Sequence, residues 1–157
     1  MLKVLIAEDD LMIAGLLEDV LIASGYEVAG CAATVDEAVL LGELHKPDLA
    51  ILDFRLAKGG RGPEIARRLK SKGNFGVLYA TGDDARISKL TLADGEASIA
   101  KPYRPEDLVR ALEIVREIAT GRTATPPFPP GFCLLLETAA GFVQAPPAWL
   151  QPLAVRP

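Results

Sequence analysis

Histidine and cysteine are scarce in this sequence, which has one histidine and two cysteines among 157 residues. His45 on its own cannot form a histidine-rich metal site, and no neighbouring residue marks it as half of a nucleophile-activating pair. Cys31 and Cys133 lie far apart and lack the short spacings of zinc ligands or of a disulfide framework. The sequence therefore argues against zinc and disulfide chemistry, and we expect both thiols to be buried.

The sequence also lacks an excess of positive charge and a long apolar run. Its 17 basic and 21 acidic residues leave a net charge of −4, whereas nucleic-acid affinity comes mostly from lysine and arginine meeting phosphates. The most apolar early stretch, residues 11–24, is interrupted by Glu18 and Asp19 and falls short of the roughly 20 apolar residues of a membrane span. No secretory signal is recognisable at the N-terminus. We expect a cytoplasmic protein without direct nucleic-acid or membrane partners.

Apolar residues are plentiful, at 50% of the chain against 24% charged residues, which is the balance of a soluble globular protein. The length suits one domain, or one domain with an extension. Because the composition changes at Gly121, we predict a domain over residues 1–120 and a proline-rich, apolar C-terminal extension over residues 121–157.

Five short apolar runs alternate with amphipathic stretches of roughly 10–15 residues, a pattern typical of a parallel sheet with helices on both faces. Continuous apolar runs such as residues 50–52 indicate strands that are buried on both sides. We therefore predict an α/β fold with a doubly wound, five-stranded parallel sheet. The predicted strands are residues 3–7, 27–31, 48–53, 75–81 and 97–100.

Several helix signals lie between these runs. Thr34 followed three residues later by Glu37 fits a capping box. Pro105, which precedes two acidic residues, suits the first turn of the last helix. The first helix is predicted to turn one apolar face towards the sheet, made of Leu11, Leu16, Leu17, Val20 and Leu21.

The extension contains eight of the twelve prolines together with large apolar side chains, which a flexible linker would not need. Residues 132–137 and 141–144, joined by residues 138–140, fit a short hairpin. Three interpretations stay open: a dimerisation or partner-docking arm, a segment folded back over its own domain, or a low-complexity segment without selected function. A helix-turn-helix output domain does not fit in these proline-rich residues.

Polar residues end four of the five predicted strands. The first strand is followed by Glu8, Asp9 and Asp10, the third ends in Asp53, the fourth in Thr81, and the fifth is followed by Lys101. In a doubly wound sheet, ligands bind outside the carboxyl ends of the strands. We therefore expect these groups to converge at one edge of the sheet.

Carboxylates without histidine or cysteine form a hard-oxygen site, which suits Mg²⁺. Asp53 is the candidate nucleophile, because aspartate can form an aspartyl-phosphate intermediate and a glycine-rich loop follows it. Thr81 would donate its hydroxyl to a phosphoryl oxygen, and Lys101 would neutralise another. Each residue alone has a structural explanation, such as Asp9 or Asp10 capping a helix, but the joint pattern favours a site.

These motifs resemble the receiver domain of two-component response regulators over about residues 1–120. The matching segments are residues 4–10, 47–53, 80–82 and 101–102. The resemblance implies a flavodoxin-like strand order 2-1-3-4-5. It also implies that Glu8, Asp9, Asp53 and the main-chain carbonyl of Arg55 hold Mg²⁺, that Asp53 accepts the phosphoryl group, and that Thr81 and Lys101 are the switch hydroxyl and the paired lysine.

The chain departs from the family pattern in three places. Ser98 stands where an aromatic switch residue is common, and Tyr79 or Tyr103 are candidates to replace it. Residues 79–83 resemble the Phe-Ala-Thr-Gly motif of a bacterial subfamily of stand-alone receivers. The loop after Asp53 is longer and more basic than usual, and we hypothesise that Arg55 pairs with Asp83 and slows the loss of phosphate.

The resemblance implies a phosphorylation-controlled signalling protein rather than an enzyme that turns over a separate substrate. A histidine kinase or a phosphotransfer protein would supply the phosphoryl group, and a downstream protein would bind at the surface formed by the fourth helix, fifth strand and fifth helix. The chain could also form a homodimer. One alternative is a pseudo-receiver that binds partners regardless of phosphorylation. The other is a small Mg²⁺-dependent aspartyl phosphohydrolase, which the absence of a general acid two residues after Asp53 disfavours.

Overall fold

The computed structural model describes residues 1–82, 84–137 and 143–144, and these form one sheet covered by helices. The strands are arranged in the order β2-β1-β3-β4-β5-β6-β7. Their bounds are Lys3–Ala7 (β1), Glu27–Ala32 (β2), Leu49–Asp53 (β3), Gly76–Thr81 (β4), Ala97–Ala100 (β5), Phe132–Leu134 (β6) and Val143–Gln144 (β7).

The first five strands confirm the predicted parallel sheet and its order 2-1-3-4-5. The bounds of β1 and β5 are those predicted, and the other three strands differ by a single residue at one end. The apolar run in β3 is fully buried between the two helical layers, as a central parallel strand requires.

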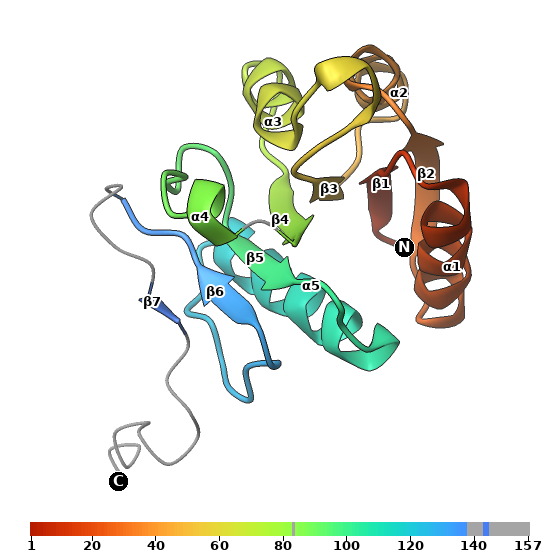
Figure 1. Cartoon of the computed structure of the whole chain (residues 1–157). Helices are drawn as coiled ribbons and strands as arrows, with labels where there is room; N and C mark the ends of the chain where they lie inside the picture. The colour runs from red at the N-terminus through yellow and green to blue at the C-terminus, as the bar shows by residue number, and fades with distance from the viewer. Residues whose placement is uncertain (83, 138–142, 145–157) are drawn as a thin grey trace, which may run out of the picture.

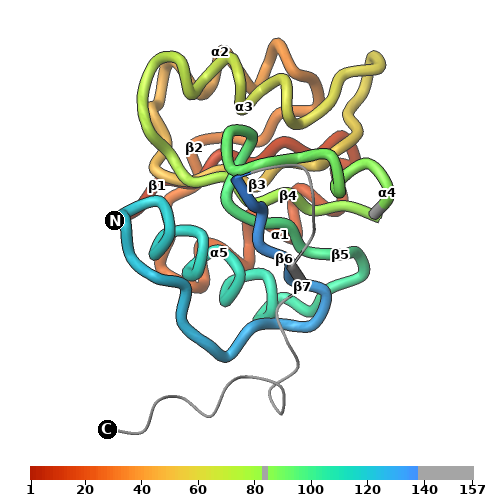
Figure 2. Tube along the Cα trace, turned by 90° about the vertical axis from the view of Figure 1, so that its left-hand side faces the viewer, coloured from red at the N-terminus to blue at the C-terminus, as the bar shows by residue number. Residues whose placement is uncertain are grey.

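Helices cover both faces of this sheet (Figures 1 and 2). Helices α1 (Leu11–Ala23) and α5 (Pro105–Ala119) pack on one face, and α2 (Val35–His45) and α3 (Gly62–Lys70) pack on the other. The expected caps are present: the Thr34 side chain accepts a hydrogen bond from the Glu37 amide at 3.2 Å, and Pro105 is the first residue of α5.

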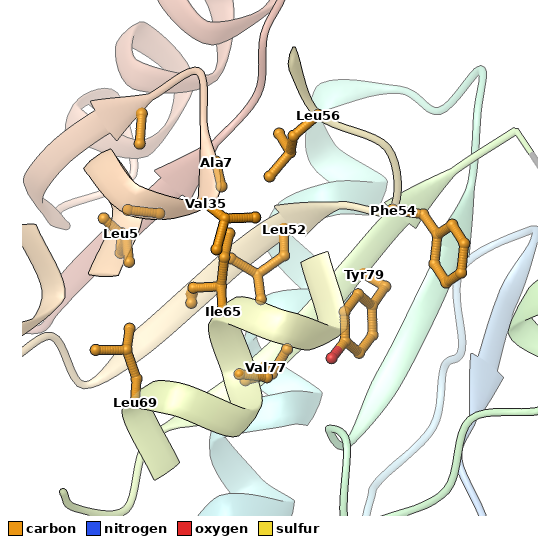
Figure 3. Packing of buried hydrophobic residues seen from close by; sticks show 14 of the residues in the cluster. Leu5, Ala7, Val35, Leu52, Phe54, Leu56, Ile65, Leu69, Val77 and Tyr79 are labelled. Carbon is orange, nitrogen blue, oxygen red and sulfur yellow. The ribbon is translucent and has the colours of Figure 1, made fainter. Parts of the chain in front are cut away.

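Each face of the sheet has its own apolar core. Figure 3 shows the cluster beneath α2 and α3, in which side chains of β1, β3, β4 and α3 meet. The predicted face of α1 is partly wrong, because Leu11 and Leu16 are 81% and 64% exposed. The buried residues of α1 are Ala14, Leu17 and Leu21, which lie three and four residues apart and so share one side of a helix.

The connection between β4 and β5 also differs from the prediction of a helix of 10–15 residues. Helix α4 spans only Asp84–Ile87. A turn follows it, in which the Asp94 carboxylate accepts a hydrogen bond from the Thr91 amide at 2.9 Å. Local side-chain bonds of this kind compete with helix formation, so the rest of the crossover is a loop.

The number of strands is the main correction to the predicted sheet. Strand β6 pairs antiparallel with β5, and β7 pairs antiparallel with β6, so the extension adds two strands beyond the predicted five. Phe132 and Leu135 are buried, and Phe128 stacks on Phe132 with ring centroids 5.9 Å apart. The free edge of β5 and the apolar side chains of the extension are thereby covered together, as burial of both favours.

This arrangement supports one of the three interpretations, an extension folded back over its own domain, for its described residues up to 137. The two strands of the predicted hairpin are present, while residues 138–142 between them lie outside the described residues. The division of the chain near residue 121 stays a prediction.

The expectation for the thiols is wrong. Cys31 is exposed and Cys133 is half-buried, because Cys31 lies on the edge strand β2, where one side of the strand has no neighbour. Among the described helices, none is both long enough and apolar enough to cross a bilayer.

Candidate phosphoacceptor site

The residues predicted to form a site meet at the carboxyl edge of the parallel strands. Glu8 and Asp9 follow β1, Asp53 ends β3, Thr81 ends β4, and Lys101 follows β5. One oxygen from each of Glu8, Asp9 and Asp53 lies within 4.8 Å of the others. The three carboxylates therefore form one acidic pocket, although 45 positions of the sequence separate Glu8 from Asp53.

Lys101 reaches into this pocket and bridges two of its carboxylates. Its Nζ donates hydrogen bonds to Glu8 Oε2 at 2.9 Å and to Asp53 Oδ2 at 3.0 Å. The side chains of Glu8, Asp53 and Lys101 are 4%, 15% and 25% exposed. The ammonium thus offsets the repulsion between two poorly solvated negative charges.

The electrostatics of the pocket reflect this balance. Burial raises the pKa of the Glu8 carboxyl above its ordinary value, against opposing hydrogen bonds from the Asp10 amide and from Lys101. Burial by itself lowers the pKa of the Lys101 ammonium, but hydrogen bonds to Glu8 and Asp53 outweigh it, so that pKa is raised. Lys101 is therefore held in its charged form between the two acids.

Asp10 has a structural role at the edge of the pocket. Its carboxylate accepts hydrogen bonds from the amides of Met12 and Ile13 at 2.9 and 3.2 Å, and so caps helix α1. Its own amide donates to Glu8 Oε1 at 3.0 Å. Of the two alternatives that the sequence left open for the helix cap, the structure selects Asp10 over Asp9.

The loop after Asp53 folds back on itself and closes against β3. The Arg55 amide lies 3.4 Å from Asp53 Oδ1, and Arg55 forms an isolated antiparallel bridge with Arg61. Asp83, the predicted partner of the Arg55 side chain, lies outside the described residues, so that pair stays a prediction.

Gly62 is a residue that the sequence analysis missed. It begins α3, and a Cβ at this position would lie 2.5 Å from the Asp53 carbonyl oxygen. No side chain fits there, because carbon and oxygen atoms in contact do not approach so closely. A glycine directly before Pro63, at the start of a helix and near the candidate nucleophile, was the available signal.

Thr81 and the two candidate aromatic residues occupy different environments. Thr81 is buried, and its carbonyl accepts a hydrogen bond from the Lys101 amide at 2.9 Å. Tyr79 is completely buried, its hydroxyl donates to the Asp94 carbonyl at 2.7 Å, and burial raises its pKa well above 10.0. Tyr103 is half-buried on the opposite face of the sheet. Tyr79 is thus anchored inside the core.

The donor set of the pocket fits magnesium. Glu8, Asp9 and Asp53 offer carboxylate oxygens, the ligand type that this hard cation prefers, and they lie close enough to share one ion. Asp9 is exposed at the rim, which leaves space for the water molecules that Mg²⁺ usually retains. The fold and the site together define the class of doubly wound α/β domains with a candidate divalent-metal site at the carboxyl edge of the sheet.

Comparison with known proteins agrees with this class. The sequence profile of the response regulator receiver domain matches residues 4–113, and the chain belongs to this family. The transcriptional regulatory protein PdtaR of Mycobacterium tuberculosis is 33% identical over 98% of this chain and 78% of its own length. The chemotaxis protein CheY of Thermotoga maritima is 30% identical over 72% of this chain and 96% of its own length.

Solved structures show the same fold. The CheY-like receiver domain protein of Methanospirillum hungatei superimposes with a TM-score of 0.69 at 27% identity, covering 77% of this chain and 98% of its own. The signal receiver domain of a modulated diguanylate cyclase from Desulfovibrio desulfuricans gives a TM-score of 0.65 at 28% identity, covering 76% and 97%. In both comparisons the shared part is the receiver domain.

Proposed function

We propose that this receiver is switched by transfer of a phosphoryl group to Asp53 from the phosphohistidine of a histidine kinase or a phosphotransfer protein. The observation that carries the proposal is the contact of Lys101 with both Glu8 and Asp53, beside the Asp9 carboxylate. Such a pocket holds a reactive carboxylate among groups that can neutralise an incoming phosphoryl group.

In this reaction an Asp53 oxygen attacks phosphorus, the bond from phosphorus to the donor nitrogen breaks, and the donor histidine leaves with that electron pair. Lys101 would contact one phosphoryl oxygen and the Thr81 hydroxyl another. Bound Mg²⁺, held by Glu8, Asp9, Asp53 and the Arg55 carbonyl, would neutralise charge on the phosphoryl oxygens. Attack by water on phosphorus would later release phosphate and restore the carboxylate.

The proposed output is a change in the affinity for a downstream protein or for a second copy of the chain. We expect no turnover of a separate substrate, because Arg55 stands two residues after Asp53 and offers no proton donor for a phosphohydrolase. A cytoplasmic location stays a prediction from the sequence.

A pseudo-receiver is the second candidate, and one observation favours it. Ser98 replaces the aromatic residue of the family pattern, and the β5 strand that carries it is paired on its outer side with β6. If this pairing stayed the same whether or not Asp53 is phosphorylated, the chain would bind its partners independently of Asp53.

The test is Mg²⁺-dependent labelling by a small acyl phosphate, followed by intact mass, on the wild type, Asp53→Asn and the surface control Asp36→Asn. We expect one phosphoryl adduct on the wild type and on the control, and none on Asp53→Asn or without Mg²⁺. Light scattering on the same samples measures dimer formation. An adduct that survives in Asp53→Asn would contradict the proposed acceptor, and no adduct on the wild type would favour the pseudo-receiver.

A further inference from the structure

We propose that residues 131–136 of the extension are the output element of this receiver, loosened from β5 when Asp53 is phosphorylated. This inference rests on the proposed phosphorylation of Asp53. It specifies how the effect of phosphorylation would be transmitted from the pocket to the surface of the protein. The sequence analysis placed the output surface at the fourth helix, fifth strand and fifth helix. In the structure β6 covers the outer edge of β5 (Figure 1), so we assign the output to the extension instead.

The end of β5 is bonded to the pocket on one side and to the extension on the other. The Lys101 amide donates to the Thr81 carbonyl at 2.9 Å, and the preceding Ala100 amide donates to the Gly131 carbonyl at 3.0 Å. Successive amides of a strand point in opposite directions. A displacement of Lys101 towards a phosphoryl group would therefore act directly on the bond between Ala100 and Gly131.

Gly131 makes this junction tight. Its backbone has a φ of +72°, and a Cβ there would lie 3.1 Å from Ala100 Cβ and 3.4 Å from the Ala100 nitrogen. The glycine thus meets two demands at once, a left-handed conformation and a close approach of two backbones. Because no side chain at position 131 separates the two backbones, a shift of the Ala100 backbone would displace Gly131.

The extension also holds the loop that leads from the Thr81 end of β4 back to β5. The Leu135 amide donates to the Glu96 carbonyl at 3.0 Å, and the Leu92 amide donates to the Leu136 carbonyl at 2.8 Å. Residues 131–136 are therefore hydrogen-bonded at the carboxyl end of β5, next to Lys101, and also to the loop that connects Thr81 with β5.

No aromatic ring is available at β5 to transmit the signal by rotation. Ser98 is buried and lies opposite Tyr79 on one side and Cys133 on the other, and Tyr79 is anchored through its hydroxyl to Asp94. Tyr103, the other candidate, follows β5 and is half-buried on the opposite face of the sheet from Tyr79. The pairing of β5 with β6 lies at the outer edge of the strand, and we infer that a change in this pairing is the response.

Two buried side chains hold the element on the domain. Phe132 is 1% exposed and stacks on Phe128, and Leu135 is 4% exposed. We therefore expect these side chains to keep the extension on the domain while the main-chain bonds of the Ala100 and Leu135 amides open. The loosened edge of β5 would then present unpaired main-chain groups.

Hydrogen exchange with mass spectrometry on the full chain, with and without acyl phosphate and Mg²⁺, tests the inference, with intact mass measured on the same samples. We expect exchange of the Ala100 and Leu135 amides to become at least about fivefold faster in the phosphorylated protein, the lower end of usual allosteric coupling. In Gly131→Ala these amides should exchange fast in both states while the adduct still forms.

Gly121→Ala is the matched control, because Gly121 also has a positive φ of +78° but no atom lies within 4 Å of its Cβ position. It should behave like the wild type. An adduct without a change in exchange at residues 92–100 and 131–136 would overturn this inference and leave the proposed function intact. Absence of an adduct would overturn both, and a Gly131→Ala protein that keeps the wild-type difference would overturn the role of the Gly131 contact.

Discussion

Lys101 Nζ lies 3.0 Å from Asp53 Oδ2, so the lysine that follows β5 is hydrogen-bonded to the candidate phosphoacceptor at the end of β3. The same nitrogen also bonds the buried Glu8. One ammonium therefore serves two roles, since it balances the charge of the resting pocket and stands where a phosphoryl oxygen would arrive.

Replacing this lysine should unbalance the pocket. In Lys101→Met, Glu8 and Asp53 would face each other without their shared donor, and we expect the free energy of unfolding to fall by about 1–3 kcal/mol, the usual cost of unsatisfied buried groups. Urea unfolding without Mg²⁺ measures this, with the exposed Lys89→Met as control. Equal stability of the two variants would show that the ion pairs contribute no net stability.

Magnesium should stabilise the folded protein. Because binding to the native state alone adds RT ln(1 + [L]/Kd), a tenfold excess over Kd is worth about 1.4 kcal/mol. We expect thermal unfolding to shift upward with Mg²⁺ in the wild type and much less in Asp9→Asn. Asp19→Asn, an exposed acid on α1, should keep the full shift. If Asp9→Asn kept it as well, Asp9 would not be a ligand.

Gly62→Ala should disturb Asp53 through its backbone. The added methyl group would overlap the Asp53 carbonyl, and we expect a loss of about 1–3 kcal/mol, typical of overpacking, together with slower labelling by acyl phosphate. Gly15→Ala in helix α1 meets no atom within 4 Å and should stabilise the protein by about 0.5–1 kcal/mol. Unchanged labelling in Gly62→Ala would show that Asp53 tolerates the shift.

The attachment of the extension to α5 should weaken in acid. Hydrogen bonds from the Thr125 amide and hydroxyl lower the pKa of Glu117 below its ordinary value of 4.5. A lowered pKa in the folded state means that the stabilisation is complete above the unfolded value and is lost as the pH falls through the folded value. The difference in unfolding free energy between wild type and Glu117→Gln should shrink as the pH falls below 4.5. A difference that is constant with pH would rule out this contribution.

Tyr79 should be structural rather than part of the switch. Tyr79→Phe removes the bond to the Asp94 carbonyl and should cost about 0.5–1.5 kcal/mol. Labelling of Asp53 and the exchange response of residues 131–136 should both persist, measured as described above. Loss of the exchange response with intact labelling would instead make the hydroxyl part of the signal path.

The sequence predicted most of the sheet because its central strands are continuous apolar runs. In a soluble α/β fold such short runs are buried between two layers of helices. It also predicted the pocket, since parallel strands bring their carboxyl ends to one edge whatever separates them in the chain. Glu8, Asp9, Asp53 and Lys101 could therefore be grouped without knowledge of the coordinates.

The apolar face of α1 and the length of α4 were not predictable in the same way. Leu11 and Leu16 are as apolar as the buried Leu17, and only the rotation of the helix on the sheet separates them. Helix α4 ends at Ile87, and a separate turn closed by the bond from the Thr91 amide to Asp94 follows in the crossover. No pattern of apolar residues records either feature.

Strand periodicity and residue chemistry are local properties, so the class of fold, the composition of the acidic pocket and the presence of an apolar extension follow from the order of residues. Three relationships follow from the folded chain instead: Lys101 bridges Glu8 and Asp53, Gly62 lies against Asp53, and β6 pairs with the edge of β5. Those relationships depend on which backbones approach each other in space, and a strand edge can be covered by any segment that satisfies its hydrogen bonds and buries its apolar side chains.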